Sequence, residues 1–327
     1  MKSFCTYFDR NYLVRGLTLY RSLMEHASPF NLYVLCFDDF TFNSLQRLNR
    51  TNLIPVALSS LEEGDAALVE TKKNRSRVEY FFTCSPSLPL YIFRRYPGIE
   101  LLTYVDADLL FFSSPEPIYS ALGDKSILII GHKFPPRLKR FESFGVFNVG
   151  FLSFRKDGPG LECLRSWREQ CLEWCFDRVE PGRFADQKYL DTWPARFDPH
   201  VVIPGHKGAN VAPWNWMNYG IREENGQVEI DGEPLIFYHF AGMKILNRWL
   251  CNPGLSHYGH GSFALRRYIY RPYLMAVRET NKWLRSVEPA VDPGYDFQHG
   301  RGGNFIKSVA RGMIHRDLIV TIGNVVI

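Results

Sequence analysis

The stretch LLTYVDADLLFF, from Leu101 to Phe112, constrains the fold of this chain more than any other segment. Almost all of its residues are apolar strand formers, so the pattern predicts a buried strand. It nevertheless carries the carboxylates of Asp106 and Asp108. An unpaired buried carboxylate costs several kcal/mol or takes up a proton. The two aspartates therefore require either a bound cation or a position where the strand emerges into a cleft.

The N-terminal half alternates short apolar runs with segments of helical spacing. Strands are expected in SFCTYF, NLYVLCF and LIPVALS, and apolar residues recur at helical spacing between Tyr12 and His26. This order is typical of an α/β protein, with a mostly parallel sheet flanked by helices. Ligands of such sheets bind beyond the carboxyl ends of the strands, which is where the two aspartates are expected.

Later segments complete the predicted outline. KFPPRLKRFESFG is expected to be a polar, mobile loop, EENGQVEIDGE carries the Asn-Gly and Asp-Gly signatures of hairpin turns, and a helix is predicted near Tyr268–Arg285. The end piece FIKSVARGMIHRDL has an apolar stripe at helical spacing, which fits either an interfacial helix or a packed terminal helix. The final IVTIGNVVI fits a strand.

Composition describes an ordered globular chain of 327 residues with 46% hydrophobic residues. No run of about 18 apolar residues lacks a charge, and the first residues lack the features of a secretory signal, so a cytoplasmic protein is expected. The seven cysteines have neither metal-ligand spacing nor a disulfide pattern. We expect them to be reduced and mostly buried.

Charge is unevenly distributed along the chain. The formal net charge is +5, yet the segment from Lys244 onward has twelve Lys and Arg residues against five Asp and Glu residues. This basic C-terminal quarter suits an anionic partner, such as a phosphate-bearing acceptor or the inner face of a membrane, reached as a peripheral contact. A solvated basic face is the alternative. No nucleic-acid recognition module is present, so no nucleic acid is expected as a partner.

The two aspartates are also suited to holding a metal ion. Successive strand residues point to opposite faces, so Asp106 and Asp108 are expected to share a face. Carboxylate oxygens are ligands for hard divalent cations, and Mg²⁺ or Mn²⁺ usually keeps open positions for substrate phosphates. An Asp-x-Asp tripeptide is common by chance, but its place at the end of a predicted strand strengthens the prediction.

YVDADLLFF, preceded by this βαβα order, resembles the Asp-x-Asp signature of GT-A glycosyltransferases, which have a Rossmann-like fold. Further segments resemble, in the same order, the retaining enzymes of glycosyltransferase family 8: FCTYFDRNYLVRGLTLYRSL, FNVGFLSFRKD, FADQKYLD and YHFAGMK. The matches extend from about residue 3 to residue 249. Lys244 follows Gly242 by two residues where the family has three, and the usual Pro-Trp is missing. The chain therefore resembles a neighbouring bacterial GT-A family.

The resemblance implies a domain organisation and an activity. Residues 1–254 would form a GT-A nucleotide-diphospho-sugar transferase domain, and residues 255–327 an aromatic, basic extension with helical structure. The implied enzyme is a metal-dependent glycosyltransferase that transfers a sugar to a glycan or lipid-linked acceptor, with retention of configuration. Its cofactors would be Mn²⁺ or Mg²⁺ and a nucleotide-sugar donor, with a UDP-sugar favoured.

The resemblance also assigns roles to individual residues. The metal ligands would be Asp106, Asp108 and His239, with Asp106 also contacting the donor. The donor sugar and the reacting centre would be positioned by Asn148, Asp186 and Gln187. The nucleobase and phosphates would be contacted by Thr6, Tyr12, Arg77 (or Arg75) and Lys244, and Trp214 or Trp216 would stack on a sugar.

Each of these assignments has a structural alternative. Asn148 fits a satisfied core amide, Asp186 and Gln187 fit a helix cap, Lys244 fits a surface lysine, and either tryptophan fits the core. Two other functions share the outline of the fold. A sugar-phosphate nucleotidyltransferase would need a glycine-rich, arginine-containing loop after its first strand, which YFDRNYLVRG lacks. A GT-A protein that binds a nucleotide sugar without turnover is the other.

Overall fold

The computed structural model describes residues 1–247, 250–291, 319–322 and 325–326. A central seven-stranded sheet has the order β3-β2-β1-β4-β7-β6-β8. Its strands are β1 (Lys2–Phe8), β2 (Phe30–Cys36), β3 (Leu53–Ala57), β4 (Leu101–Val105), β6 (Ile127–Gly131), β7 (Phe147–Arg155) and β8 (Val201–Val202). Strand β7 is antiparallel to both of its neighbours, and the other pairs are parallel. The predicted α/β class with a mostly parallel sheet is confirmed.

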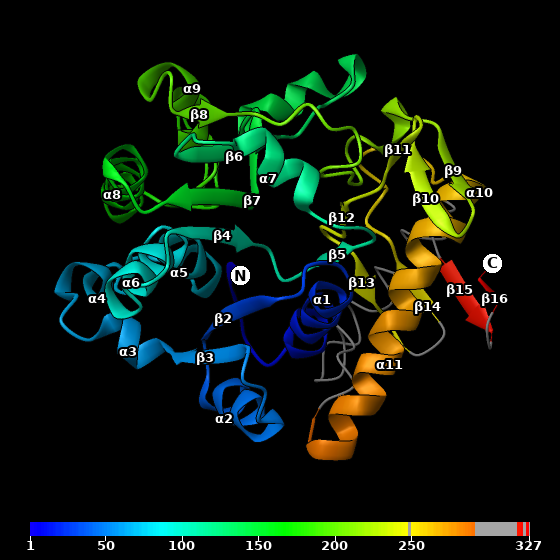
Figure 1. Cartoon of the computed structure of the whole chain (residues 1–327), viewed down its shortest axis with the longest axis horizontal. Coiled ribbons are helices and arrows are strands. Elements are labelled where there is room, and N and C mark those ends of the chain that lie inside the picture. Colours follow the sequence, from blue (N-terminus) through cyan, green and yellow to red (C-terminus); the bar gives the residue numbers. More distant parts are fainter. Residues whose placement is uncertain (248–249, 292–318, 323–324, 327) are drawn as a thin grey trace.

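Helices cover both faces of this sheet. The α-helices are α1 (Leu13–His26), α2 (Asp39–Leu48), α3 (Leu58–Glu62), α4 (Ala66–Thr71), α5 (Arg77–Cys84), α6 (Ser87–Arg95), α7 (Glu116–Leu122), α8 (Gly158–Glu173), α9 (Trp193–Arg196), α10 (Phe263–Leu265) and α11 (Arg271–Val287). Short 3₁₀ and π turns are η1 (Pro136–Phe144), η2 (Lys188–Thr192), η3 (Trp216–Asn218) and η4 (Arg266–Tyr270). In Figure 1, α4, α5, α6 and α8 lie on the left of the sheet and α1 and α11 on the right.

Smaller sheets lie beside the main one. A hairpin sheet contains β9 (Ile221–Glu224), β10 (Gln227–Ile230) and β11 (Glu233–Pro234). A two-stranded sheet pairs β5 (Leu109–Phe111) with β12 (Phe237–His239). A third sheet contains β13 (Lys244–Ile245), β14 (Leu250–Asn252), β15 (Ile319–Ile322) and β16 (Val325–Val326). The hairpin turns carry the predicted Asn-Gly and Asp-Gly pairs, whose four residues all have positive φ.

The two faces of the sheet bury separate hydrophobic clusters. Because strand residues alternate, Phe4 packs on the α1 side while its neighbour Cys5 packs on the α8 side. The cluster on the α1 side also includes residues of α11, so this part of the C-terminal segment packs against the sheet domain. All seven cysteines are buried and free, as the sequence predicted.

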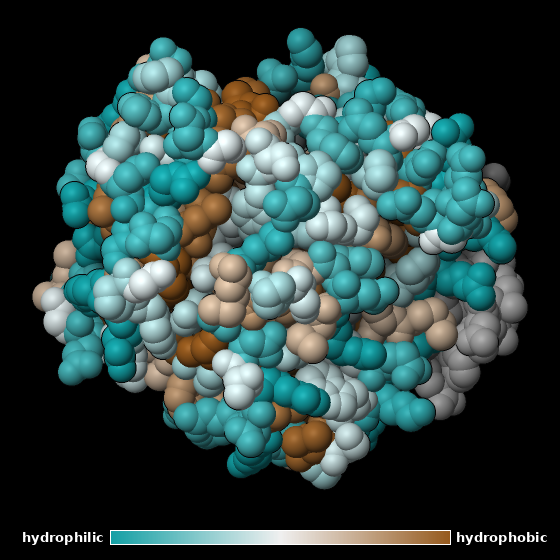
Figure 2. Space-filling view, viewed as in Figure 1, coloured by the Kyte–Doolittle hydropathy of each residue, from teal (hydrophilic) through white to brown (hydrophobic). Residues whose placement is uncertain are grey.

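The face of the molecule that Figure 2 shows is mainly polar. On the face seen in Figure 1, hydrophobic residues show in separate patches among polar ones (Figure 2). Among the described residues, no helix is both long enough and apolar enough to cross a membrane.

One expectation about the central strand is wrong in detail. LLTYVDADLLFF does not form one strand, because β4 ends at Val105 and β5 begins at Leu109, in a different sheet. The intervening residues form a turn, so Asp106 and Asp108 do not share a strand face. The physical reason is the cost of burying carboxylates within a sheet: the chain leaves the main sheet where the polar residues begin.

Two other segments differ from expectation or lie outside the described residues. The segment predicted as a mobile polar loop contains the 3₁₀ helix η1. The predicted amphipathic helix in FIKSVARGMIHRDL lies outside the described residues. The strand prediction for the end of the chain agrees with β15 and β16, and the helix predicted near Tyr268–Arg285 is η4 and α11. The domain boundary at residue 254 stays a prediction.

The packing of α1 on the sheet generates a first prediction. A Cβ added to Gly16 would lie 2.2 Å from the ring of Phe8, which is buried at the end of β1. Alanine raises helix propensity by about 1 kcal/mol, but overpacking a buried ring costs typically 1–3 kcal/mol. The net expectation is that Gly16→Ala lowers the free energy of unfolding in urea, by up to about 2 kcal/mol.

The matched control is Gly158→Ala, in the first turn of α8, where the added Cβ meets nothing within 4 Å. We expect this variant to be neutral or slightly stabilised. Equal stability changes in the two variants would contradict the close packing of α1 on β1.

Candidate metal centre and active site

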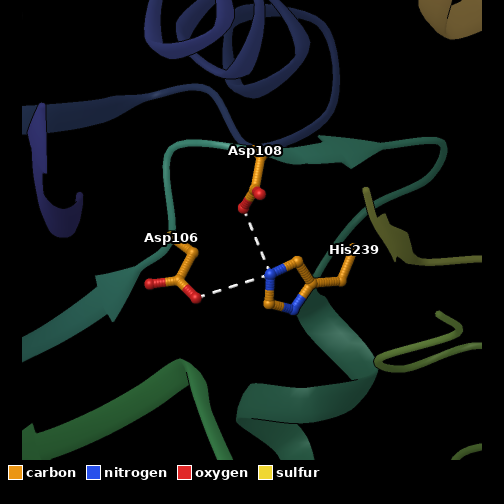
Figure 3. Close-up of side chains that lie close together, drawn as sticks. All are labelled: Asp106, Asp108 and His239. Atoms are coloured by element: carbon orange, nitrogen blue, oxygen red, sulfur yellow. Dashed lines mark ion pairs between the residues drawn. The ribbon is translucent and has the colours of Figure 1, made fainter. Parts of the chain in front are cut away.

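Three side chains converge at the carboxyl end of β4. Asp106 immediately follows β4, and Asp108 lies in the turn that leads into β5. His239 ends β12, whose antiparallel pairing places it opposite Leu109. Figure 3 shows the edge of the imidazole facing both carboxylates. The pairing of β5 with β12 therefore brings a histidine from a remote part of the sequence to the Asp-x-Asp turn.

The three groups are close and mostly buried. The Nε2 atom of His239 lies 3.1 Å from Asp108 Oδ1 and 3.5 Å from Asp106 Oδ2. The side chain of His239 is 4% exposed, that of Asp108 13% and that of Asp106 28%. One ligand atom from each residue lies within 4.8 Å of the others, a spacing that fits one shared metal ion. The more exposed Asp106 leaves an approach to the site.

The cluster of Asp106, Asp108 and His239 contains two acidic groups and one basic group, so negative charge is in excess. Burial raises the pKa of Asp106, which His239 offsets only in part while Asp108 raises it further. Burial opposes ionisation of Asp108 too, but His239, the charge of Arg15 and a main-chain hydrogen bond together lower the pKa of Asp108. Burial alone would lower the pKa of His239, but Asp108 and then Asp106 raise it. A second positive charge at this point would stabilise both carboxylates as anions.

A chain of amide hydrogen bonds fixes the orientation of the imidazole. It starts at the carbonyl of Phe144, which can only accept, and which receives Gln187 Nε2 at 3.0 Å. Gln187 Oε1 then accepts from Asn148 Nδ2 at 3.1 Å. Asn148 Oδ1 lies 3.2 Å from His239 Nδ1, so Nδ1 carries the proton that it donates. Nε2 therefore faces the two carboxylates, where it carries a proton in the charged ring and would offer its lone pair to a metal ion in the neutral one.

These residues fit a divalent cation. Two carboxylate oxygens and one neutral imidazole nitrogen are a ligand set that suits Mn²⁺ and is compatible with Mg²⁺. Histidine ligands of metals typically donate their other nitrogen to a supporting acceptor, here Asn148 Oδ1. Asp106 is supported in the same way, because the Tyr104 hydroxyl donates to its Oδ1 at 2.8 Å. Asp106, Asp108 and His239 would hold the ion, as the resemblance implied.

Sequence reasoning missed Gly150 in the middle of β7. Its amide donates to Asn148 Oδ1 at 3.1 Å, and its carbonyl accepts from the amide of Asp106 at 3.0 Å. A Cβ at this position would lie 2.5 Å from Asn148 Oδ1 and 2.9 Å from the ring of His239. A glycine inside a buried strand often marks a close approach of this kind, so the pattern FNVGFLSF contained the signal.

Asp186 lies in a second buried cluster near the first. It is 4% exposed, and its carbonyl accepts from the indole of Trp167 at 2.8 Å. Burial raises the pKa of Asp186 to about 7, a hydrogen bond with Ser85 lowers it, and the charge of Asp106 raises it. The Ser85 hydroxyl also lies 3.2 Å from the Tyr7 hydroxyl. The cap alternative does not hold for Gln187, because Gln187 precedes η2 without a side-chain cap bond.

In both Asn148 and Gln187, the amide oxygen and the amide nitrogen each have a hydrogen-bond partner in the protein. The structure therefore places them in the support of His239, and their predicted contacts with a sugar stay predictions. Asn148 is 5% exposed, so the alternative that it is a hydrogen-bonded amide of the core agrees with its burial. Its Nδ2 also lies 3.4 Å from Nε2 of the buried His132.

The residues predicted to contact the nucleotide lie around the end of β1. Thr6 is fully buried in β1, and its hydroxyl has no hydrogen-bond partner within the described ranges. Tyr12 directly precedes α1, and the guanidinium of Arg15 lies 4.6 Å from the centre of its ring. Arg77 donates to Asp9 Oδ2 at 2.9 Å. Asp9, one residue beyond β1, was not predicted.

Other predicted contacts have structural positions. Arg75 is buried, donates to the carbonyls of Leu172 and Glu173, and lies over the ring of Phe176 at 3.8 Å. Trp214 is 5% exposed and its ring centre lies 5.2 Å from that of His239, so it belongs to the core beside the metal ligands.

Two predicted residues lie nearer the surface. Trp216 is half-buried at the start of η3. Lys244 begins β13, has an exposed side chain and follows Gly242, which has a φ of +71°.

Comparison with known proteins places the chain in a family. No protein-family model matches it. It is 31% identical over 300 residues to YfnD of Bacillus subtilis (strain 168). That alignment spans 91% of this chain and 93% of YfnD. It is 33% identical over 255 residues to YfnF of the same organism. This second alignment spans 75% of this chain and 82% of YfnF. The chain belongs to the family of these two proteins, both described as uncharacterized.

The fold is shared with a solved glycosyltransferase. The galactosyltransferase LgtC, in a complex with donor and acceptor sugar analogues, matches with a TM-score of 0.52. The match covers 84% of this chain and 95% of LgtC at 16% sequence identity. The GT-A fold implied by the motif resemblance is thereby confirmed.

The position of Gly150 generates a prediction about metal binding. We expect Gly150→Ala to displace Asn148 and His239 and to weaken Mn²⁺ binding by roughly 10- to 100-fold, the usual effect of disturbing the support of a metal ligand. Isothermal titration calorimetry with Mn²⁺ measures this change. The control is again Gly158→Ala, which should bind Mn²⁺ as the wild type does. Unchanged affinity in Gly150→Ala would contradict the proposed support.

The buried carboxyl of Asp186 generates a prediction about pH. Its pKa is about 7 in the folded protein against an ordinary 3.8, so at intermediate pH the folded state holds a proton that the unfolded state has lost. The stability contributed by this proton is complete below the lower value and is lost as pH rises to about 7, at about 1.4 kcal/mol per pH unit.

Asp186→Asn removes this titration while keeping the shape. We expect the free energy of unfolding of the variant, relative to wild type, to rise by a few kcal/mol between about pH 4 and pH 7. Urea unfolding in EDTA, in steps of one pH unit, measures it. Asp124→Asn, at an exposed position, should run parallel to wild type. A parallel curve for Asp186→Asn as well would show that Asp186 titrates normally.

Proposed function

We propose that this protein is a metal-dependent glycosyltransferase that transfers a sugar from a nucleotide-diphosphate sugar to a glycan or lipid-linked acceptor. The observation that carries this proposal is the cluster of Asp106, Asp108 and His239 at the carboxyl end of β4. Ligands of open α/β sheets bind at this edge. The GT-A fold shared with the galactosyltransferase LgtC supports the same reading.

The chemistry of the cluster suits departure of a nucleoside diphosphate. Breaking the bond between the sugar and the β-phosphate leaves negative charge on the phosphate, and a bound Mn²⁺ or Mg²⁺ stabilises that charge as it develops. Asp106 and Asp108 would hold the ion, and His239 would supply its Nε2 lone pair from a ring fixed by Asn148. Lys244 adds a positive charge for the same phosphate.

The donor would lie along the carboxyl edge of the sheet. Thr6, Tyr12 and Arg77 surround the end of β1, next to β4 in the sheet, and would contact the nucleotide, with a UDP-sugar favoured. Asp186 would accept from a sugar hydroxyl, with Gln187 and Asn148 behind it. We infer retention of configuration, with the acceptor hydroxyl attacking from the side that the diphosphate leaves.

The distribution of charge indicates the kind of acceptor. The basic C-terminal quarter, including the exposed Lys282 and Arg285 of α11, suits a phosphate-bearing acceptor or the anionic inner face of a membrane. The seven buried, free cysteines support work in a reducing compartment such as the cytoplasm.

Release of nucleoside diphosphate tests the proposed function. We expect wild-type protein to release it from one member of a panel of UDP-, GDP- and ADP-sugars, only with Mn²⁺ or Mg²⁺ present. Asp108→Asn removes one negative ligand, so release should fall at least about 100-fold. The control Asp124→Asn replaces an exposed carboxylate and should retain wild-type rates.

The products separate the proposal from its alternatives. A sugar-phosphate nucleotidyltransferase would release pyrophosphate from a nucleoside triphosphate and a sugar phosphate. A GT-A protein without turnover would be stabilised against heat by metal and nucleotide while releasing nothing. Silence across the panel, with no shift in melting temperature on adding metal and nucleotide, would count against the metal centre itself.

A further inference from the structure

A cavity lies among the helices on the α8 side of the sheet, away from the metal centre. It has a volume of about 570 Å³, and its walls come from α6, α8, the turn between α3 and α4, and Lys156. Lys156 donates its main-chain N–H to the carbonyl of Glu100, which precedes β4. Lys156 therefore lies at the amino end of β4, whereas Asp106 follows the carboxyl end. The two sites share no lining residue.

Positive charge gathers around this cavity. Arg94, Lys156, Arg165 and Arg168 line it, against only two acidic residues, Asp65 and Glu169. Arg168 is committed to Asp65, whose two carboxylate oxygens it contacts at 2.6 Å. Lys156 donates its ammonium to the carbonyl of Pro97 at 2.9 Å, so its charge is not neutralised.

Two of the arginines, Arg94 and Arg165, differ from Arg168 in their contacts. Within the described ranges, neither Arg94 nor Arg165 forms an ion pair or a side-chain hydrogen bond, although Arg94 lies over the ring of Tyr91 at 5.9 Å. They extend from different helices, since Arg94 belongs to α6 and Arg165 to α8, and these helices pack together. Both side chains are exposed around one concave site, and in the part of the chain that the structure describes Glu169, four residues after Arg165, forms no ion pair with either of them.

The rest of the wall fits an organic group attached to that anion. Leu90, Tyr91 and Leu161 give the cavity apolar and aromatic surface. Ser87 also lines it, and its hydroxyl is buried with no hydrogen-bond partner among the residues described. A volume of about 570 Å³ is in the range of small-molecule sites and much larger than a bare ion needs.

We propose that this cavity binds a phosphate monoester on a small organic group, with Arg94 and Arg165 as the phosphate-binding residues. Guanidinium groups pair with phosphate oxygens in a bidentate geometry, and the dianion of a monoester matches two uncompensated cations. Lys156 adds a third positive charge at the rim. The phosphate ester comes either from a soluble sugar phosphate or from the headgroup of an anionic lipid.

Calorimetric titration of the full chain, in low salt with EDTA, tests the proposal. The soluble probes are glucose 1-phosphate and inorganic phosphate, and the lipid probe is phosphatidylcholine vesicles with and without phosphatidic acid. We expect glucose 1-phosphate or the phosphatidic acid vesicles to bind, with affinity about tenfold weaker in Arg94→Gln and in Arg165→Gln, as expected for loss of one charge-assisted contact. Their double variant should show no binding.

The matched control is Arg196→Gln, an exposed arginine outside the cavity, which should bind like wild type. Binding of glucose 1-phosphate identifies a soluble ester, and binding of the phosphatidic acid vesicles alone identifies a lipid headgroup. Binding that survives in the double variant, or no binding of any probe to wild type, overturns the proposal. None of these readouts depends on sugar transfer, so the result stands apart from the proposed glycosyltransferase activity.

Discussion

The arrangement of this molecule depends on two carboxylates that face one imidazole at the end of a buried strand. Asp106, Asp108 and His239 carry more negative than positive charge even when the ring is protonated, and burial leaves little water to compensate. These three residues would hold a divalent cation with Nε2 deprotonated, and its charge would offset both carboxylates. The site is therefore costly for the folded chain alone and favourable once it holds a metal, which is the usual relation between stability and function at a metal centre.

The fold around the cluster follows from the same constraint. If LLTYVDADLLFF had continued as one strand, both carboxylates would have lain inside the sheet. The chain instead turns after Val105, and its second half pairs with β12, the strand that delivers His239. Gly150 permits the close approach, because any side chain there would occupy the space of Asn148 and the imidazole. One turn, one strand pairing and one glycine thus assemble the centre.

The sequence predicted the class of fold and marked Asp106 and Asp108 as candidate metal ligands because those features have local signals. Alternating apolar runs reveal a sheet with helices, and Asp-x-Asp after such a run has few structural uses. The resemblance supplied His239, which no local pattern marks. The break between β4 and β5 was missed because a continuous apolar run hides the boundary between two sheets. The roles of Asn148 and Gln187 within the protein were also hidden, since a hydrogen-bonded chain of residues 144, 148, 187 and 239 exists only after folding.

That chain also links the metal centre to the segment predicted as a mobile loop. Phe144 ends η1, and its carbonyl accepts from Gln187 Nε2, which leaves Gln187 Oε1 as the acceptor for Asn148 Nδ2. If η1 moved away, Gln187 would lose this acceptor, while the Gly150 amide would still hold Asn148 Oδ1 as the acceptor for His239 Nδ1. An ordered η1 therefore helps to hold the amide of Gln187, and through it Asn148 Nδ2, in one orientation. The rim beside the centre and the centre itself are in this way parts of one structural unit.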